Sequence, residues 1–118
     1  NDISGEIDAL WLKPDREMLS RESFRALTED TQRARIPLLV ETDNMVRAGG
    51  LFAVVPDAAG LGRQAAELAK RLVDGEAPSS IAIEPPQEVK VVLNLRTVKS
   101  TNIPFEEMLL DFVDVVIE

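Results

Sequence analysis

The chain lacks cysteine, histidine and tyrosine, and its 118 residues include one tryptophan and four phenylalanines. Without histidine or cysteine, the chain has neither the usual general base nor a thiol nucleophile, and most transition-metal sites lose their preferred ligands. A Ser-His-Asp hydrolase is excluded for the same reason. We therefore expect no enzyme activity, no metal and no cofactor. The missing cysteines say little about the cellular compartment.

Long apolar runs and clustered basic residues are also missing. No run approaches the length of a membrane span. The 13 basic residues are scattered among 21 acidic ones, which give a formal net charge of −8. Phosphate binding depends on clustered lysine and arginine, so we expect no nucleic-acid partner. The length predicts a single segment spanning residues 1–118.

Short apolar segments alternate with amphipathic ones along the chain. This alternation predicts an α/β fold, with a mostly parallel sheet flanked by helices. We expect strands at residues 7–12, 36–40, 51–56, 81–84 and 89–95, and helices at 20–35, 57–72, 95–100 and 105–112. Ser20 is the expected start of the first helix, and Asn94 is the expected cap of the helix at 95–100. In the strand at 89–95, alternation predicts one buried face formed by the odd-numbered residues. Residues 113–118 fit either a strand or coil.

Residues 51–75 are the stretch around which the other elements are organised. Residues 51–56 are apolar throughout, which is typical of a fully buried strand. Asp57 follows as a helix N-cap, and Gly75 suits the position after the helix. Ligands of open α/β sheets bind where strands end and such turns begin, so a binding cleft is expected here.

An ordered series of short motifs links this chain to a known family. The motifs lie at residues 8–15, 36–37, 46–51, 56–57, 60–69, 75–78, 85–86, 94–97 and 116–118. In order and spacing they resemble the C-terminal half of ABC-transporter substrate-binding proteins of the type I periplasmic-binding-protein fold. This family includes tryptophan- and tyrosine-binding lipoproteins. The resemblance runs from about residue 7 to residue 118, and no single motif in it is unique.

The resemblance implies a two-lobed protein that holds a small ligand in the cleft between its lobes and delivers it to an ABC permease in the membrane. It implies a periplasmic or extracytoplasmic location, with membrane tethering in the full-length form. It also implies that the N-terminal lobe lies outside these residues and that the stretch after Pro56 belongs partly with that lobe. Apolar faces are then expected to be exposed, and the missing lobe or a second copy of the chain is expected to cover them.

Polar residues that follow the expected strands are the candidate ligand-binding residues. Thr42, Asp43 and Asn44 follow the strand at 36–40, where an acidic side chain can meet an amino group and its neighbours can donate or accept hydrogen bonds. Asp15 follows the first strand and Asp57 follows the strand at 51–56. Each has a simpler interpretation: a solvated loop for residues 42–44, a local turn for Asp15 and a helix cap for Asp57.

Other conspicuous residues have plainer interpretations. Gly60 and Gly62 lack the third glycine and the lysine of a phosphate-binding loop, so close helix packing is expected there. Trp11 lies in the middle of a strand and is expected in the core. Arg63 and Arg96 have the chemistry to bind a carboxylate, but surface positions are expected for both.

Three alternative functions remain open at this point. One alternative is the same domain in a membrane sensor, where closure of the two lobes over the ligand sends a signal instead of delivering the ligand to a permease. A phospho-accepting receiver domain would suit the length, the acidity and Asp57, but only one acidic residue follows the first strand, where a receiver needs a pair. The third alternative is an enzyme with the carboxylates of Glu41 and Asp43 as its only catalytic groups, but no feature of the sequence places a substrate between them. The ligand itself is not identified: aromatic amino acids, other amino acids and short peptides all remain open.

Overall fold

The computed structural model describes residues 5–13 and 19–118. The chain divides into two compact units. Unit 1 comprises the described residues up to Val55 together with Val91–Glu118, and unit 2 is Pro56–Lys90. The chain thus leaves unit 1 after Val55 and returns to it at Val91.

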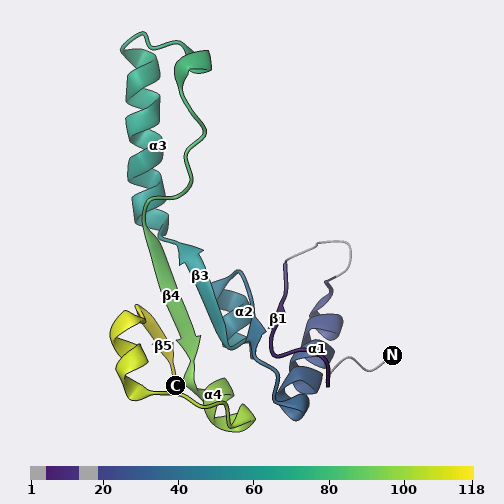
Figure 1. Cartoon of the computed structure of the whole chain (residues 1–118). Helices are drawn as coiled ribbons and strands as arrows, with labels where there is room; N and C mark the ends of the chain where they lie inside the picture. Colours follow the sequence, from purple (N-terminus) through teal and green to yellow (C-terminus); the bar gives the residue numbers. More distant parts are fainter. Residues whose placement is uncertain (1–4, 14–18) are drawn as a thin grey trace. The chain divides into compact units, whose positions relative to one another are not determined.

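Five short strands form one sheet in the order β1-β2-β3-β4-β5. They are β1 (Leu10–Trp11), β2 (Leu38–Leu39), β3 (Phe52–Pro56), β4 (Val89–Asn94) and β5 (Val115–Ile117). The pairs β1–β2, β2–β3 and β4–β5 are parallel, whereas β3 and β4 are neighbours that run in opposite directions (Figure 1). The predicted α/β class with a mostly parallel sheet is confirmed.

Helices follow the strands and begin at residues that the sequence marks. The α-helices are α1 (Arg21–Ala34), α2 (Asp43–Arg47), α3 (Ala58–Val73) and α4 (Leu95–Thr101), and the 3-10 helices are η1 (Pro78–Ser80) and η2 (Glu107–Phe112). Ser20 caps α1 in a capping box with Ser23. Asn94 caps α4 by accepting hydrogen bonds from the N–H groups of Arg96 and Thr97. The predicted helix starts at Ser20, Asp57 and Asn94 are therefore confirmed.

The core of unit 1 lies on one face of the sheet, which we call the first face. Alternate residues of all five strands contribute to it: Leu10, Leu12, Leu38, Val40, Ala53, Val55, Val92, Val115 and Ile117. Phe24 of α1 and Val46 of α2 pack against them. Because β1, β2 and β3 are parallel and follow one another across the sheet, right-handed connections place α1 and α2 on this same face.

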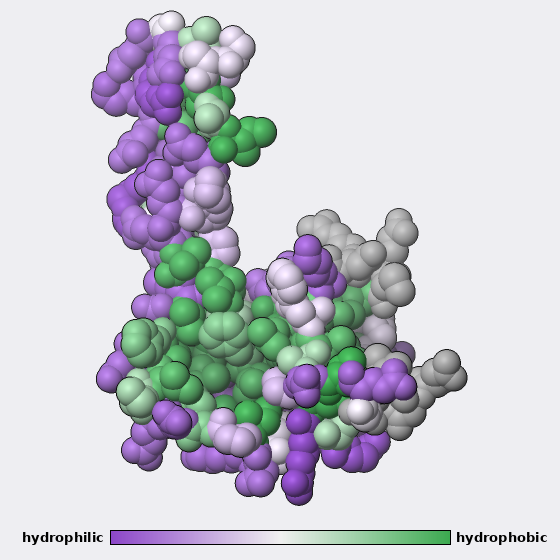
Figure 2. Space-filling model, in the orientation of Figure 1, coloured by the Kyte–Doolittle hydropathy of each residue, from purple (hydrophilic) through white to green (hydrophobic). Residues whose placement is uncertain are grey.

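The opposite face of the sheet is also apolar, and we call it the second face. Successive strand residues point to opposite faces, so the second face consists of Trp11, Leu39, Phe52, Val54, Val91, Leu93 and Val116. Leu93 is 5% exposed, but Val54 and Trp11 are 48% and 63% exposed. The second face is therefore covered near β4 and left open near β1 and β3. Figure 2 shows that hydrophobic side chains gather on one side of unit 1.

Unit 2 contains the long helix α3, the short 3-10 helix η1 and a return segment that polar contacts hold along α3. Gln64, only 9% exposed, donates from Nε2 to the carbonyl of Pro85 (3.0 Å) and accepts from the N–H of Gln87 (3.2 Å). Gly60 lies so close to Glu88 that a Cβ on the glycine would be 2.8 Å from the Glu88 Cβ, which confirms close packing there. Gly62 has no such neighbour within 4 Å.

Several predicted elements are wrong. Residues 81–84 form no strand, because Pro85 and Pro86 leave that segment without a pairing partner. Residues 105–112 contain only the short 3-10 helix η2 rather than a full helix. The open choice for residues 113–118 is decided by β5, whose pairing with β4 supplies the hydrogen bonds.

The predicted burial of two strands is also wrong. The strand at 51–56 was expected to be fully buried, but only Ala53 is, because the second face lacks a complete cover. In β4, Val92 is 1% exposed and Asn94 is 3% exposed although alternation assigned both to the open side, while Val89 is 52% exposed.

Within the described residues, no helix has both the length and the apolar character needed to cross a membrane.

Candidate binding site

Thr42, Asp43 and Asn44 lie at the carboxyl end of β2, at the start of α2. The predicted loop is therefore wrong in part, because the helix begins at Asp43 once the Thr42 side chain caps it by accepting from the N–H of Met45 (3.2 Å). Asn44 is exposed. The three polar residues thus stand at a strand end as predicted, but on the first turn of a helix.

The Asp43 carboxylate has one oxygen without a hydrogen-bond partner among the described residues. Its Oδ2 accepts a hydrogen bond from Nε of Arg47 at 3.1 Å, and the carboxylate as a whole is 44% exposed. Its Oδ1 is buried and accepts no hydrogen bond from the described residues. A carboxylate oxygen without a donor is costly, so Asp43 carries hydrogen-bonding capacity that the local fold does not use.

Trp11 lies at the same edge of the sheet and was not among the predicted site residues. β1 is parallel to β2, and the N–H of Leu12 donates to the carbonyl of Leu39 (2.9 Å), so both strands end on one side. The prediction of Trp11 in the core is wrong: it is 63% exposed because it belongs to the second face. Lys13 Nζ lies 5.1 Å from the centroid of its ring, a cation–π contact.

The side of β1 on which Trp11 lies follows from its two neighbours once the covered face of the sheet is known. Leu10 and Leu12 pack on the first face, so the residue between them must point away from it. An aromatic residue on the second face, two positions before Lys13 at a strand end, is a candidate surface for stacking. The remaining candidate of this edge, Asp15, lies outside the described residues.

Asp57, in unit 2, is already engaged by its own neighbours. It accepts from the N–H of Gly60 at 2.8 Å and forms an ion pair with Lys90, and its side chain is 14% exposed. The hydrogen bond from Lys90 and then that from Gly60 hold the pKa of the Asp57 carboxyl below its ordinary value of 3.8. Its role as a helix cap is established, and a ligand contact at Asp57 stays a prediction.

The charged residues flagged as alternative anion binders lie on the surface as expected. Arg63 donates from Nη2 to both carboxylate oxygens of Glu88, at 2.8 and 2.7 Å, and this carboxylate raises the pKa of the guanidinium. Arg71 donates from two nitrogens, Nε and Nη2, to the two carboxylate oxygens of Glu76, and Arg96 is exposed. Among the described residues, no three acidic side chains are grouped so that they would hold a metal ion.

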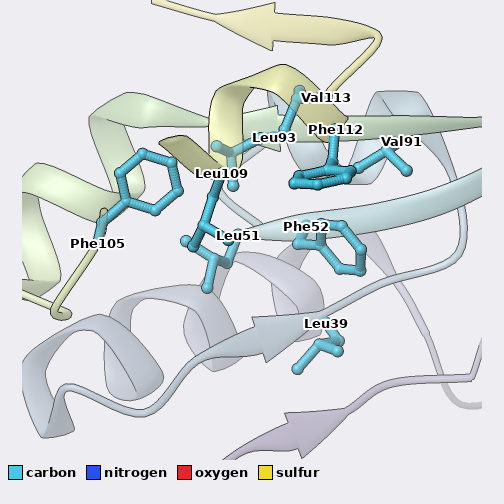
Figure 3. Close-up of a pocket in the computed structure, with 9 residues that line it drawn as sticks. All are labelled: Leu39, Leu51, Phe52, Val91, Leu93, Phe105, Leu109, Phe112 and Val113. Atoms are coloured by element: carbon cyan, nitrogen blue, oxygen red, sulfur yellow. The ribbon is translucent and has the colours of Figure 1, made fainter. Parts of the chain in front are cut away.

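A separate concavity lies on the second face of unit 1. It has a volume of about 390 Å³ and apolar walls from the strands and from the η2 segment (Figure 3). Its lining residues are Leu39, Leu51, Phe52, Val91, Leu93, Phe105, Leu109, Phe112 and Val113. We call this space the apolar groove. Thr42, Asp43 and Asn44 are not among its lining residues, so it is distinct from the polar strand-end edge.

Comparison with known proteins places this arrangement in a family. The model of the family described as ABC transporter substrate binding protein matches residues 1–117. The chain belongs to this family. No curated protein sequence matches it significantly.

Solved structures of similar fold agree with the family. A substrate binding protein with adhesive properties from Clostridium difficile, in a ligand-free and open structure, has a TM-score of 0.77 at 17% identity. An ABC domain in complex with L-Trp from Streptococcus pneumoniae has a TM-score of 0.70 at 23% identity, and a conserved domain protein from Vibrio cholerae one of 0.69 at 17%.

This chain is much shorter than the three solved chains. The comparisons cover 98%, 98% and 97% of this chain, but only 38% of each solved chain. At these identities they show the fold of the chain.

Proposed function

We propose that this chain is part of the solute-binding component of an ABC-type uptake transporter, which captures a small polar ligand in a cleft between two lobes. The observation that carries the proposal is the family match over residues 1–117. A similar fold in a protein solved with L-Trp supports an amino acid as the ligand class. The family match also favours this function over a phospho-accepting receiver.

We place the ligand at the edge where β1 and β2 end, which is where open α/β sheets bind their ligands. Asp43 supplies a carboxylate for the ligand's ammonium group, and Thr42 and Asn44 supply polar groups beside it. Trp11 offers an exposed aromatic face and Lys13 a cation for a carboxylate. Asp15 follows β1 in sequence and is proposed as a further contact.

The other half of the cleft is proposed to come from a lobe outside these residues. In this proposal unit 2 associates with that lobe, since α3 exposes Leu61 and Leu72, 45% and 44% exposed, on one side. A ligand that contacts both lobes stabilises the closed form over the open one, which is a shift of population. Without that lobe, we expect the chain to associate with itself.

A permease in the membrane is the proposed partner, and a periplasmic or extracytoplasmic site with membrane tethering is the proposed location. A sensor of the same architecture would bind the same ligand without promoting uptake. Uptake of the labelled ligand by cells with and without the gene separates these two roles.

Binding is tested on the full-length protein with a panel of L-amino acids and short peptides. Thermal unfolding identifies the ligand that raises Tm, and calorimetry then gives its Kd. We expect Asp43→Asn and Trp11→Ala each to weaken binding by about 10- to 100-fold, the loss of one charge-assisted hydrogen bond or one stacking contact. The matched control is Asp30→Asn, a carboxylate on α1 that is 71% exposed.

Two results would overturn the proposal. One is that no member of the panel changes Tm. The other is that a ligand is found but Asp43→Asn and Trp11→Ala bind it as well as Asp30→Asn does, which would place the ligand elsewhere.

A further inference from the structure

Another concavity of unit 1 lies at the edge of the sheet opposite to the polar strand-end edge. Asn94, the last residue of β4, donates from its N–H to the carbonyl of Leu51, which precedes β3, at 2.9 Å. β4 therefore ends beside the start of β3, whereas residues 42–44 follow the end of β2. Open α/β sheets bind ligands at the carboxyl ends of their strands, and the reversed direction of β4 gives this sheet such ends on both edges.

The concavity has a volume of about 400 Å³, and every residue that lines it belongs to the connection from β4 to β5. We call it the connection pocket. α4 forms one wall, and Asn102 then adopts a left-handed conformation (φ 51°) that ends the helix and turns the chain. Residues 103–110, which follow this turn, form the other wall. The apolar lining residues are Leu95, Val98, Ile103, Phe105 and Leu110.

The polar lining of the connection pocket carries one charge of each sign. Lys99, Asn102 and Glu107 are exposed, whereas the apolar lining residues are buried or half-buried. Within the described part of the chain, neither Lys99 nor Glu107 forms an ion pair, although Lys70 and Arg71 on α3 both pair with acidic neighbours. The ammonium group and the carboxylate therefore keep unused hydrogen-bonding capacity at the same pocket.

The combination of one cation and one anion selects the charge of an occupant. A solute with a single carboxylate is attracted by Lys99 and repelled by Glu107, and a solute with a single ammonium group meets the reverse. A zwitterion brings the opposite charge to each side chain. The apolar lining residues can bury a hydrocarbon group, and a volume of about 400 Å³ lies in the range of small-molecule sites.

We propose that the connection pocket is a second binding site, which takes a small zwitterion with an apolar body. The ligand carboxylate meets Lys99, its ammonium group meets Glu107, and its hydrocarbon packs against Val98 and Phe105. The Asn102 amide donates or accepts beside the charged groups. An apolar amino acid and a short apolar peptide share this chemistry. The inference does not rest on the proposed function, because the pocket shares no residue with the polar strand-end edge.

Methyl NMR of the full-length protein tests the site with three probes that share one branched hydrocarbon. L-leucine carries both charged groups, 3-methylbutylamine only the ammonium group and 4-methylpentanoate only the carboxylate. The methyl groups of Val98 and Leu110 report binding, because both residues line the connection pocket and neither lines the apolar groove. We expect L-leucine to shift both signals and to bind about 10-fold more tightly than either singly charged probe.

The dipeptide Leu-Leu, titrated in parallel, distinguishes an amino acid from a short peptide as the preferred occupant. It carries the same two charged groups at a larger separation. Tighter binding of either L-leucine or the dipeptide than of the singly charged probes supports the inference.

Two substitutions should change which probe the pocket prefers. Lys99→Met keeps the hydrocarbon stem and removes the cation, so we expect L-leucine to bind about 10-fold more weakly and 3-methylbutylamine at least as tightly as before. Glu107→Gln should weaken L-leucine similarly and spare 4-methylpentanoate. Lys70→Met and Glu67→Gln, exposed on α3, are the matched controls and should leave every Kd unchanged. A purely structural role of Lys99 or Glu107 would not alter the preference between probes.

Three results would overturn the inference. One is that no probe shifts the methyl signals of Val98 and Leu110, as when a segment outside these residues fills the pocket. Another is that neither L-leucine nor the dipeptide binds more tightly than the singly charged probes. The third is that Lys99→Met and Glu107→Gln leave every Kd at its parent value, which would place the ligand elsewhere. None of these results bears on the proposed function, which Asp43→Asn and Trp11→Ala test separately.

Discussion

An apolar cluster joins all five strands of unit 1 to α1 and α2, whereas unit 2 holds α3 to its return segment by polar contacts. In unit 1, Leu38 and Val46 are 2% and 0% exposed. In unit 2, the described apolar side chains include Val73 at 86% and Ile83 at 102% exposed. The difference separates a part that has a core from a part that has none of its own.

This difference has energetic consequences. Burial of apolar surface is the dominant favourable term in folding, while exposed ion pairs contribute between zero and about 1 kcal/mol each. Unit 2 contains several exposed pairs, among them Arg63 with Glu88 and Lys70 with Asp74. We therefore expect unit 1 to unfold as a cooperative body and unit 2 to open locally at lower free energy.

The largest expected effect is in the core of unit 1. Leu38→Ala should lower the free energy of unfolding of the 118-residue chain by about 2–5 kcal/mol, because it leaves a cavity in a packed cluster. Val73→Ala in unit 2 should stay within about 0.5 kcal/mol. Urea unfolding followed by circular dichroism measures both. If both substitutions lowered the free energy of unfolding equally, the conclusion that only unit 1 has a core would be wrong.

The same pair of substitutions in the full-length protein sharpens the comparison. A cost above about 1 kcal/mol for Val73→Ala there would mean that polypeptide outside this chain covers the exposed side of α3. An unchanged, near-zero cost would leave α3 without such a cover.

A smaller effect is expected at the buried polar contact of unit 2. Gln64→Ala removes both hydrogen bonds to the return segment and leaves the Pro85 carbonyl and the Gln87 N–H without their partner. We expect a loss of about 1–2 kcal/mol, confined to unit 2. Hydrogen exchange should quicken at α3 and residues 84–88 while the strands of unit 1 stay protected. Glu67→Ala, an exposed position of the same helix, is the control, and faster exchange throughout unit 1 would contradict the prediction.

The smallest expected effect is a dependence of unit 2 on acid. Lys90 and Gly60 lower the pKa of Asp57 below 3.8, and Arg71 lowers the pKa of Glu76 below its ordinary value of 4.5. The unfolded chain therefore takes up these protons at a higher pH than the folded chain. Their stabilisation is fully present above the ordinary values and is lost as pH falls through the lowered ones.

Urea unfolding followed at amide signals of α3, at pH 6 and pH 3, measures this loss. Asp57→Asn should reduce the difference between the two pH values, whereas Asp111→Asn, an exposed position in unit 1, should leave it unchanged. Identical pH responses of the parent chain and Asp57→Asn would show that the cap contributes no pH dependence.

Local signals in the sequence were reliable where a residue acts on its own neighbours. Ser20, Asp57 and Asn94 each cap the helix that their position predicted, because a cap needs only a side chain and the next turn of backbone. The motif series likewise predicted the family. The alternating pattern gave the wrong buried residues in β4, because the end of this strand is buried on both faces. Trp11 was wrongly predicted in the core, because a position in the middle of a strand does not say which face of the sheet is covered.

By itself, the sequence determined the α/β class, the helix starts and the apolar character of both strand faces, since these depend on spacing and side-chain chemistry. Only the tertiary structure decided that Thr42 to Asn44 share an edge with Trp11, that Asp57 is taken by Lys90, and that one sheet face stays open. Those outcomes depend on strand register and on the hand of each crossover, which bring together residues far apart in the chain.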